Sequence, residues 1–454
     1  MKLTVLGGGG FRAPILAKSL ALGAKSAKID EVVLQDTNET RLNCYGALAE
    51  ALANRIAPQL HLTRTTDARA ALTGADYVIT TIRPGAEEGR AFDERCAIDC
   101  GVLGQETTGA GGYAMALRSI PAIADYCRLA REVASPGVQI LNFTNPAGLV
   151  TQAMRDLGYD NVYGVCDAPT TLFHQLSDML DIPRGTVFAR SYGLNHLSWF
   201  DEVTVDGKDA MAQILAHPAL YEKTDMGLFG ADLLRQCGNV LPNEYFYFWY
   251  FQRQSLASVK AAEKARGETI AEINAQMLAE LQAMNISADF DAAFHCYAKY
   301  VAQREGSYFA IETGHQQRHA DVPTAADFIA RPDGGGYAGV ALDFIRARES
   351  GIPANMVLSI PNNGAIAELA DSDVAELSCR VEKGGLTAIP APKLSPEKAN
   401  LLRTVKQYET LAVQSILENN AEKAVQALTI HPLVADYGAA KALVNRFTRK
   451  YQPA

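Results

Sequence analysis

A glycine-rich run near the N-terminus has the residue types that bind a dinucleotide. Read from Gly8, its spacing is Gly-x-Gly-x-x-Ala, a form of the fingerprint in which glycines permit a tight turn and let backbone N–H groups reach a pyrophosphate. We therefore predict that this loop binds a dinucleotide cofactor. Its members are Gly7, Gly8, Gly9, Gly10, Phe11 and Arg12.

An acidic residue follows the loop near the distance expected for a ribose contact. Asp36 ends the second apolar stretch, 26 residues beyond Gly10, and the fingerprint places such an acid about 20 residues on. A carboxylate at this position repels the 2′-phosphate of NADP. The loop and the acid together favour NAD, while a turn or helix-cap role for Asp36 stays open from the sequence.

Polar side chains gather at the ends of three later strand-like segments. The first is the run 142–148, the second carries Cys166 and Asp167, and the third carries Asn195 and His196. Parallel sheets place ligands at the carboxyl ends of their strands. A cysteine and a histidine in such positions could share a divalent metal, but spacing alone leaves a structural role open for both.

These residues need a scaffold that brings strand ends together, and the first third of the chain predicts one. Short β-branched runs alternate with amphipathic stretches, which is typical of βαβ units around a buried parallel sheet. The expected strands are Leu3–Leu6, Glu31–Gln35, Asp76–Ile82, Gln139–Phe143 and Asn161–Val165, with helices at Ile15–Leu22 and Ile120–Val133 between them.

After about Val165 helical patterns dominate. We expect helices at 172–180, 271–283 and 396–418 and strands at 187–192, 202–205 and 356–360. The sequence has no internal repeat and no linker-like stretch between the two patterns. We therefore predict an α/β fold in which a Rossmann-type parallel sheet, residues 1–165, merges with a larger α+β domain for catalysis, substrate binding and oligomerisation, residues 166–454.

Composition excludes several classes of protein. Of the 454 residues 48% are hydrophobic, which is too many for a disordered chain, and the net charge of −9 argues against nucleic acid as the partner. No apolar run reaches the roughly 20 residues of a membrane span. The apolar N-terminal stretch is too short for a signal peptide, and the eight cysteines are scattered, so we expect reduced thiols and a cytoplasmic location.

Taken together, the motifs resemble glycoside hydrolase family 4, the NAD- and metal-dependent glycosidases, and most of all its 6-phospho-β-glucosidases. The resemblance runs nearly end to end and in the family's order. It rests on the glycine loop up to Pro14, Ile82-Arg83-x-Gly85, Asp93-Glu94-Arg95, the runs 104–109 and 142–148, the Cys166 motif, Asn195-His196, the run 361–364 and Tyr408-Glu409.

The resemblance implies roles for residues that spacing alone did not assign. Cys166 and His196 become ligands of a divalent metal, first of all Mn²⁺. Tyr245, which opens an aromatic run, becomes the catalytic base, with Tyr247 as the alternative. Because the pKa of a free phenol lies near 10, a nearby cation such as the metal must lower it.

The same resemblance implies the contacts to substrate and cofactor. Asn145 would bind a sugar hydroxyl near the cofactor, and Arg83 would join the glycine loop and Asp36 in cofactor binding. Arg90 and Arg266 would hold an anionic group at C6, since guanidinium forks match tetrahedral oxyanions. An ion pair with Asp93 or Glu94 is the alternative role of Arg90.

The implied reaction is hydrolysis without net redox change. NAD⁺ takes a hydride from C3 of the sugar, the ketone acidifies the C2 proton for Tyr245, and the metal stabilises the enediolate. The aglycone leaves C1 by elimination, water adds, and the hydride returns from the same NADH. The implied substrate is a small anionic sugar glycoside, first a 6-phospho-β-glucoside, and the implied assembly is a homodimer or homotetramer.

Two residues depart from the 6-phospho-β-glucosidase pattern. Asp167 follows the ligand cysteine where that branch usually has Asn. An acid there is typical of 6-phospho-α-glucosidases, and it could protonate the leaving oxygen or orient Cys166. Pro84 stands where a β-branched residue usually precedes Gly85. An α-glycosidase and a 6-sulfo sugar, as in sulfoquinovose glycosides, therefore stay open, as do a hydroxy-acid-type NAD dehydrogenase and a non-catalytic NAD sensor.

Overall fold

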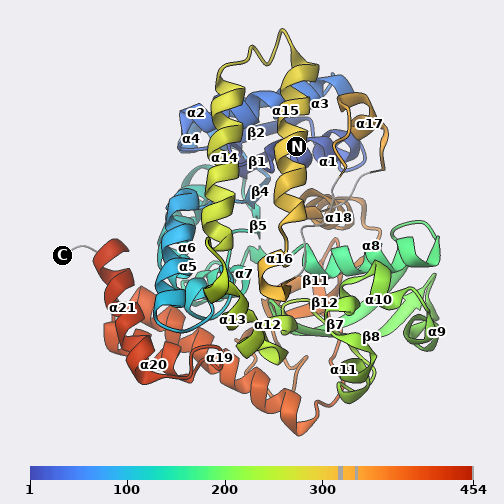
Figure 1. Ribbon diagram of the computed structural model, residues 1–454. Helices are drawn as coiled ribbons and strands as arrows, with labels where there is room; N and C mark the ends of the chain where they lie inside the picture. Colours follow the sequence, from blue (N-terminus) through green and yellow to red (C-terminus); the bar gives the residue numbers. More distant parts are fainter. Residues whose placement is uncertain (315–320, 333–335, 452–454) are drawn as a thin grey trace.

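One mixed sheet runs through the computed structural model, which describes residues 1–314, 321–332 and 336–451 (Figure 1). Its strands are β1 (Lys2–Leu6), β2 (Glu31–Gln35), β3 (His61–Thr65), β4 (Tyr77–Thr80), β5 (Gln139–Asn142), β6 (Val162–Gly164), β7 (Val187–Leu194), β8 (Leu197–Val205), β9 (Lys208–Asp209), β10 (Leu241–Pro242), β11 (Ala354–Pro361), β12 (Val374–Glu382) and β13 (Gly385–Ala388). The order across the sheet is β3-β2-β1-β4-β5-β6-β11-β12-β7-β8-β10, with β13 on β12 and β9 on β8.

The first six strands form the predicted Rossmann-type sheet. They pair in parallel in the order 3-2-1-4-5-6 of a dinucleotide-binding fold. Their residues are apolar almost throughout because helices cover both faces, and β4 is buried at every position. The sequence missed β3, in which His61, Thr63 and Arg64 hide the apolar signal of an edge strand.

The free edge of the parallel sheet is occupied by the second half of the chain. β11 pairs antiparallel with β6, where Ser359 lies opposite Gly164, and β12, β7, β8 and β10 continue the sheet as antiparallel strands. The predicted strands at 187–192, 202–205 and 356–360 are confirmed inside longer ones, β7, β8 and β11. The fold is therefore a Rossmann-type α/β sheet merged with an α+β second part, as predicted.

Helices surround the sheet and extend beyond it. The α-helices are α1 (Ala13–Gly23), α2 (Glu39–Arg41), α3 (Ala47–Ile56), α4 (Ala68–Leu72), α5 (Ala86–Asp99), α6 (Gly109–Val133), α7 (Ala147–Asp156), α8 (Ala168–Leu180), α9 (Met211–Ala216), α10 (Leu220–Lys223), α11 (Gly230–Gln236), α12 (Phe246–Tyr250), α13 (Gln252–Ala261), α14 (Arg266–Gln282), α15 (Phe290–Gly306), α16 (Ala310–Thr313), α17 (Ala325–Ala330), α18 (Gly336–Ser350), α19 (Pro396–Leu417), α20 (Ala421–Ile430) and α21 (Tyr437–Tyr451), with a π-helix, η1 (Leu42–Gly46), and a 3₁₀ helix, η2 (Asp225–Leu228). Within the described ranges, no helix is both long and apolar enough to cross a membrane.

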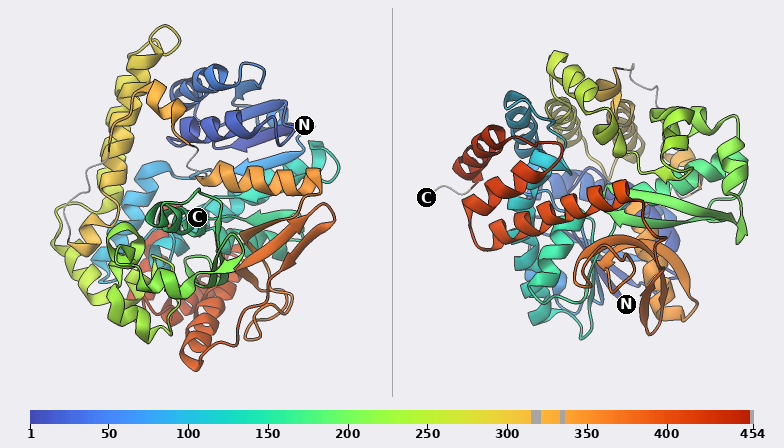
Figure 2. Two further views of the ribbon diagram at one scale, coloured as in Figure 1. Left: turned by 90° about the vertical axis from the view of Figure 1, so that its right-hand side faces the viewer. Right: turned by 90° about the horizontal axis from the view of Figure 1, so that it is seen from below.

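Two features of this arrangement bear on function. The N-terminal elements lie at one end of the molecule and the C-terminal helices α19–α21 at the other, so the middle of the sheet is enclosed between them (Figures 1 and 2). The helices α14 and α15 form a long antiparallel pair beside the N-terminal elements. The first residue of α14, Arg266, and the last residue of α15, Gly306, lie at the open end of this helical hairpin. This open end points toward the enclosed region, and the loop between the helices points away from it.

Candidate active site

The glycine loop lies where the sequence predicts it, at the carboxyl end of β1 and before α1. The backbone N–H groups of Gly7 and Gly8 donate to the carbonyl of Gln35, each at 2.8 Å. A Cβ at Gly8 would lie 2.6 Å from Leu34 Cβ, and one at Gly7 2.7 Å from the carbonyl of Thr81. The loop therefore needs glycine because it crosses so close to β2 and to the end of β4.

A cavity beside the loop gathers most of the residues predicted to bind the cofactor. Its lining residues include Gly7, Gly8, Gly10, Phe11, Arg12, Asp36, Arg83 and Asn145. Gly9 does not line it, but its N–H donates to Asp36 Oδ2 at 3.0 Å. Burial raises the pKa of Asp36, against hydrogen bonds from Asn38 and Gly9 that favour the ionised form. The cavity joins the predicted pyrophosphate and ribose contacts to Asn145.

The two predicted metal ligands meet. Cys166, directly after β6, has its Sγ 3.4 Å from Nε2 of His196. His196 belongs to the two-residue turn between β7 and β8, has φ +62° and is buried. Its Nδ1 is buried without a hydrogen-bond partner. Burial lowers the pKa of His196 to about 4, so the imidazole is neutral and can act as a ligand at neutral pH.

Of the two tyrosines considered as the base, Tyr245 lies at this pair and Tyr247 does not. The ring of Tyr245 stacks on the imidazole of His196 with centroids 4.0 Å apart. The hydroxyl of Tyr308 donates to the Tyr245 hydroxyl at 3.5 Å. The hydroxyl of Tyr247 instead donates to the carbonyl of Glu312 at 3.4 Å. Burial, followed by the charge of Glu244, raises the pKa of Tyr245, so a base role requires a cation beside it.

Asp167 connects the metal pair to the cofactor loop. It occupies the N-cap position of α8 but its side chain makes no capping hydrogen bond; its Oδ2 instead forms an ion pair with Arg12 Nη1 at 3.0 Å. Because Arg12 belongs to the glycine loop and Asp167 is adjacent to Cys166, the pair spans the two halves of the site. Asp167 therefore has a partner in this structure, and the sequence offered no signal for that partner.

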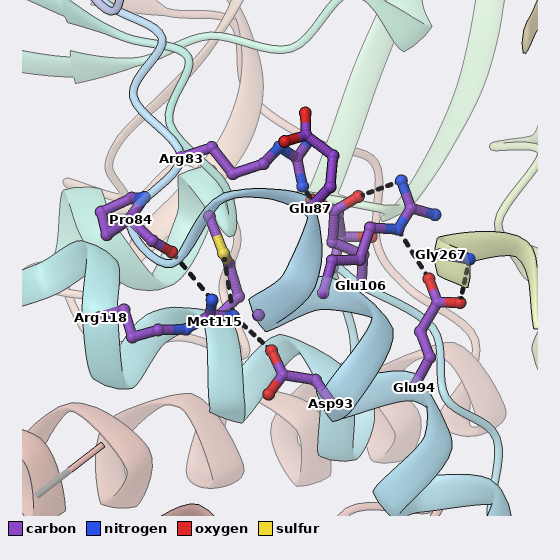
Figure 3. A network of polar contacts seen from close by, with 12 residues as sticks. Arg83, Pro84, Glu87, Asp93, Glu94, Glu106, Met115, Arg118 and Gly267 are labelled. Atoms are coloured by element: carbon purple, nitrogen blue, oxygen red, sulfur yellow. Dashed lines mark hydrogen bonds and ion pairs between the residues drawn. The ribbon is translucent and has the colours of Figure 1, made fainter. Parts of the chain in front are cut away.

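Of the two arginines predicted near the C6 group, Arg90 belongs to a buried network of ion pairs, of which Figure 3 shows Arg83, Glu94 and Glu106. Arg90 Nε pairs with Glu94 at 2.7 Å and its Nη1 with Glu106 at 2.9 Å, and Glu106 also pairs with Arg83. Burial alone would raise the pKa of Glu106, but the charges of Arg83 and Arg90 prevail and lower it to about 2. Glu94 Oε2 also accepts from the N–H of Gly267 at 2.6 Å, which ties α5 to the start of α14.

Arg266 lies next to Gly267 at the first turn of α14 and has a different environment from Arg90. Its guanidinium lies over the ring of Tyr308, 5.0 Å from the centroid, and its Nε is buried without a partner. Through Tyr308 it reaches Tyr245. The structure thus brings Arg266 to the same region as the tyrosine and the metal pair.

Sequence reasoning missed two buried carboxylates. Glu106 stood within a motif of the resemblance but received no role, although it joins Arg83 to Arg90. Glu376 on β12 accepts hydrogen bonds from Asn195 Nδ2 at 2.9 Å and Ser198 Oγ at 2.7 Å, one on each side of His196. The only signal for Glu376 is a charge that interrupts the apolar run of β12.

Comparison with known proteins gives the family. The model described as "Family 4 glycosyl hydrolase" matches residues 2–182, and that of the "Family 4 glycosyl hydrolase C-terminal domain" matches residues 191–434. The 6-phospho-beta-glucosidase BglT of Thermotoga maritima is 27% identical over 446 residues, 98% of this chain and 97% of that protein. The phospho-alpha-glucosidase PagL of Clostridium acetobutylicum is 25% identical over 98% of this chain and 96% of its own length.

A solved structure gives the same answer for the fold. The Thermotoga maritima 6-phospho-beta-glucosidase, solved with manganese, NAD⁺ and glucose-6-phosphate, superposes with a TM-score of 0.80 at 26% identity and covers 99% of both chains. This chain belongs to the family 4 glycosyl hydrolases.

Proposed function

We propose that this chain hydrolyses 6-phosphoglucosides, first of all 6-phospho-β-glucosides, with NAD⁺ and Mn²⁺ as cofactors. The observation that carries the proposal is a continuous series of contacts through the candidate site. Arg12 of the cofactor loop pairs with Asp167 beside Cys166, Cys166 meets His196, and His196 stacks on Tyr245. Tyr308 then links Tyr245 to Arg266. Cofactor loop, metal ligands, base and anion contact thus adjoin one another.

The loop residues fit an NAD molecule. The turn at Gly7 and Gly8 leaves no room for a Cβ, as expected where a backbone must approach a pyrophosphate. Asp36 lies at the end of β2, the position for the adenosine ribose. Arg41, which lines the same cavity, forms an ion pair with Glu87. These contacts support NAD rather than NADP, since no unpaired cation is offered to a 2′-phosphate by these residues.

The Cys166–His196 pair fits a borderline-soft divalent metal. A neutral imidazole and a cysteine sulfur 3.4 Å apart supply two donors of the type that such a metal accepts. Within the described residues no group of three or more His, Cys, Asp or Glu side chains is placed to hold a metal. A metal held by this pair would keep coordination positions open for substrate and water, as catalytic metals do.

The residues of the chain then divide the reaction among them. When bound, NAD⁺ supplies a hydride acceptor and donor at C3, and the metal supplies Lewis acidity. Tyr245, once its phenol is ionised beside the metal cation, would take the C2 proton at its phenolate oxygen, since its ring lies against a metal ligand. Asn145, in the wall of the cofactor cavity, orients a sugar hydroxyl. Arg90 and Arg266 hold the phosphate and thereby fix the ring relative to Tyr245.

Asp167 decides the anomeric preference in this proposal. Its contact with Arg12 supports a role in holding the loop and the metal ligand together, which suits a β-glucosidase. A general-acid role, as in an α-glucosidase, requires that this ion pair open when substrate binds. Named relatives of both kinds lie at 25–27% identity, so the α-glycoside is the second candidate.

A panel of nitrophenyl glycosides tests the function directly. We expect aglycone release from the 6-phospho-β-glucoside in the presence of NAD⁺ and Mn²⁺, no accumulation of NADH, and loss of activity with EDTA that Mn²⁺ restores. Cys166→Ser and His196→Ala should abolish turnover. NADH that accumulates in proportion to substrate consumed would instead indicate a dehydrogenase. Release from neutral or 6-sulfo sugars alone would refute the phosphate assignment.

We also propose a homodimer or homotetramer located in the cytoplasm. All eight cysteines are free thiols in the structure, which suits a reducing compartment. Light scattering of the purified protein measures its mass, and a monomer at micromolar concentration would contradict the assembly.

A further inference from the structure

A small cavity lies against the imidazole of His196. Its wall comes from segments far apart in the sequence, among them the β7–β8 turn with His196, α7 with Gly148, α12 with Trp249 and α19 with Glu409. Among the described residues, it shares no lining residue with the cofactor cavity. Its volume of about 20 Å³ is enough for one water molecule, which needs about 10–15 Å³ of free volume.

Two nitrogen atoms in this wall have no partner in the part of the chain that the structure describes. His196 Nδ1 and Trp249 Nε1 are both buried, and neither donates a hydrogen bond to the protein. The two side chains come from different elements and meet at this one cavity. Because a buried N–H group without an acceptor destabilises a fold, the two nitrogens indicate an acceptor inside the cavity.

The carboxylate of Glu409 also lines the cavity. Its Oε2 forms an ion pair with Lys406 at 2.5 Å that lacks hydrogen-bond geometry, and Oε1 receives no hydrogen bond from the described residues. A Cβ at Gly148 would lie 3.4 Å from Glu409 Oε1 and 3.2 Å from Asn195 Cβ. The small residue therefore lets the carboxylate approach the turn that carries His196.

The imidazole of His196 has to carry its proton on Nδ1 when it binds a metal. Its Nε2 lies 3.4 Å from Cys166 Sγ and is therefore the nitrogen that faces the metal in the proposed site. Metal-binding histidines almost always donate their other N–H to a carboxylate, a backbone carbonyl or a water molecule, which fixes the ring and raises its basicity. Within the described ranges, Glu409 is the only carboxylate in the cavity wall.

We propose that one water molecule in this cavity joins His196 Nδ1–H to Glu409 Oε1, which makes Glu409 a positioning residue for the metal ligand. The water accepts from His196 and from Trp249 Nε1–H, and it donates to Glu409. These three hydrogen bonds lie in the usual range of about two to four for a buried water molecule. This inference rests on the proposed function, in which His196 binds the metal. Glu409 belongs to the motif Tyr408-Glu409, to which sequence reasoning assigned no role.

A purely structural role of Glu409 is the alternative explanation. Lys406, its partner in the ion pair, also donates to the carbonyl of Val374 at 2.6 Å, so the ion pair ties α19 to β12. Burial raises the pKa of Glu409, and the charge of Lys406 opposes this rise. Lys406 is not among the described residues that line the cavity. The ion pair and the contact to water can therefore be removed separately.

The experiment compares two double variants of the full chain that both lack the ion pair. One combines Lys406→Met with Glu409→Gln, and the other combines Lys406→Met with Glu409→Leu. Neither leaves a buried charge unpaired, which protects the fold, and they differ in whether an acceptor oxygen remains at position 409. The measurements are the affinity for Mn²⁺ by calorimetry with NAD⁺ bound, the melting temperature, and a crystal structure of the wild type without metal.

We expect the double variant with Glu409→Leu to bind Mn²⁺ about 10- to 100-fold more weakly than the wild type, the usual effect of losing a partner that orients a metal ligand. The double variant with Glu409→Gln keeps the acceptor and should stay within about threefold of the wild type. Both should melt at similar temperatures, because both lack the ion pair.

The crystal structure should show one ordered water molecule within hydrogen-bond distance of His196 Nδ1, Trp249 Nε1 and Glu409 Oε1. Trp249→Phe removes one of the three partners of this water. It should therefore weaken Mn²⁺ binding about 3- to 10-fold, the usual effect of losing one neutral hydrogen bond.

Two results would overturn the inference. One is equal affinity of the two double variants for Mn²⁺, and the other is a crystal structure without an ordered water in the cavity. If the double variant with Glu409→Leu does not fold, Trp249→Phe decides, and wild-type Mn²⁺ affinity in that variant would contradict the bridge. Failure of the proposed function is distinct, because it is a wild-type protein that binds no Mn²⁺ or releases no aglycone, whereas the water is seen in the metal-free crystal.

Discussion

Hydrogen bonds from the surrounding backbone orient Asp36, the residue that we propose as the contact to the adenosine ribose. Its two carboxylate oxygens accept hydrogen bonds from the N–H groups of Gly9, at 3.0 Å, and Asn38, at 2.9 Å. We predict that Asp36→Ser weakens NAD⁺ binding about tenfold or more, since a charged hydrogen bond to the ribose contributes roughly 1.5–3 kcal/mol. The same change should narrow the preference for NAD⁺ over NADP⁺. Fluorescence titration with both cofactors measures it, and an unchanged ratio of affinities would contradict the role.

Glu106 stabilises the arginine network as an ionised group. We predict that Glu106→Gln lowers the free energy of unfolding by about 3 kcal/mol, because it leaves buried Arg83 and Arg90 short of a counter-charge. The pKa of Glu106 is lowered from 4.5 to about 2, so its contribution is present above pH 4.5 and is lost as the pH falls toward 2. Urea unfolding measured between pH 4.5 and 2 should therefore show a smaller loss of unfolding free energy in Glu106→Gln than in the wild type.

A surface ion pair provides the control for Glu106. Glu50 pairs with Arg64 at 2.7 Å, and both side chains are about one-third exposed. Glu50→Gln should cost less than about 1 kcal/mol, as exposed pairs do. Equal effects of the two substitutions would show that burial does not strengthen the Glu106 network.

The residue types of the site could be read from the sequence, but their pairing could not. The glycine loop and Asp36 follow the spacing of the dinucleotide fingerprint, whereas Cys166 and His196 were assigned from a family resemblance; the structure places all of them at ends of strands. The sequence left two roles open for Arg90, a contact to the anionic C6 group and an ion pair with Asp93 or Glu94. The structure shows the ion pair with Glu94. Its second partner, Glu106, lies beyond the helix, and only the packing of α5 against the 104–109 segment reveals it.

At the scale of elements, the β7–β8 hairpin carries His196 in an unusual conformation. The turn has two residues, Asn195 and His196, and His196 has φ +62°, a region that non-glycine residues adopt at a cost. Glu376 on the neighbouring β12 binds the side chains of Asn195 and Ser198, so it holds both sides of the turn.

We predict that Glu376→Ala weakens Mn²⁺ binding by roughly 10- to 100-fold, the usual effect of losing a residue that orients a ligand. Glu376→Gln, which keeps one acceptor oxygen, should lose less. Calorimetric Mn²⁺ titration measures both variants. Ser359→Ala on β11 is the control, because Ser359 Oγ is buried without a partner. Wild-type Mn²⁺ affinity in Glu376→Ala would show that the turn holds its shape unaided.

The elements themselves followed from hydrophobic periodicity wherever the period was clear. Apart from β3, which was missed, the strands of the parallel sheet lie within a few residues of their expected ranges, as do the helices α8, α14 and α19. α6 begins at Gly109 instead of near 120, because its first turns are buried on all sides and show no polar face. Hydrophobic periodicity arises only where one face of a helix is buried and the other is exposed. A helix that is buried on all sides therefore lacks this pattern and cannot be predicted from it.

For the whole molecule, the sheet crosses the boundary predicted at residue 165. β6 belongs to the parallel half, and β11 pairs with it where Gly164 faces Ser359. A Cβ at Gly164 would lie 2.5 Å from Thr151 Oγ1 and 2.7 Å from Ser359 Cβ, so the halves are packed closely at this junction. The Arg12–Asp167 pair is one of several further contacts that join the halves, and it lies beside the site.

This continuity predicts that the chain unfolds as one unit and that NAD⁺ stabilises all of it. The two tryptophans, Trp199 and Trp249, both lie in the second half, whereas the cofactor cavity is lined by residues of the first. A ligand at 100 times its dissociation constant adds about 2.7 kcal/mol. Tryptophan fluorescence and far-ultraviolet circular dichroism should therefore report one melting temperature, which NAD⁺ raises equally in both signals. The melting temperature of the Asp36→Ser variant should rise less than that of the wild type at the same NAD⁺ concentration. A fluorescence transition that NAD⁺ leaves in place would mean that the halves unfold independently.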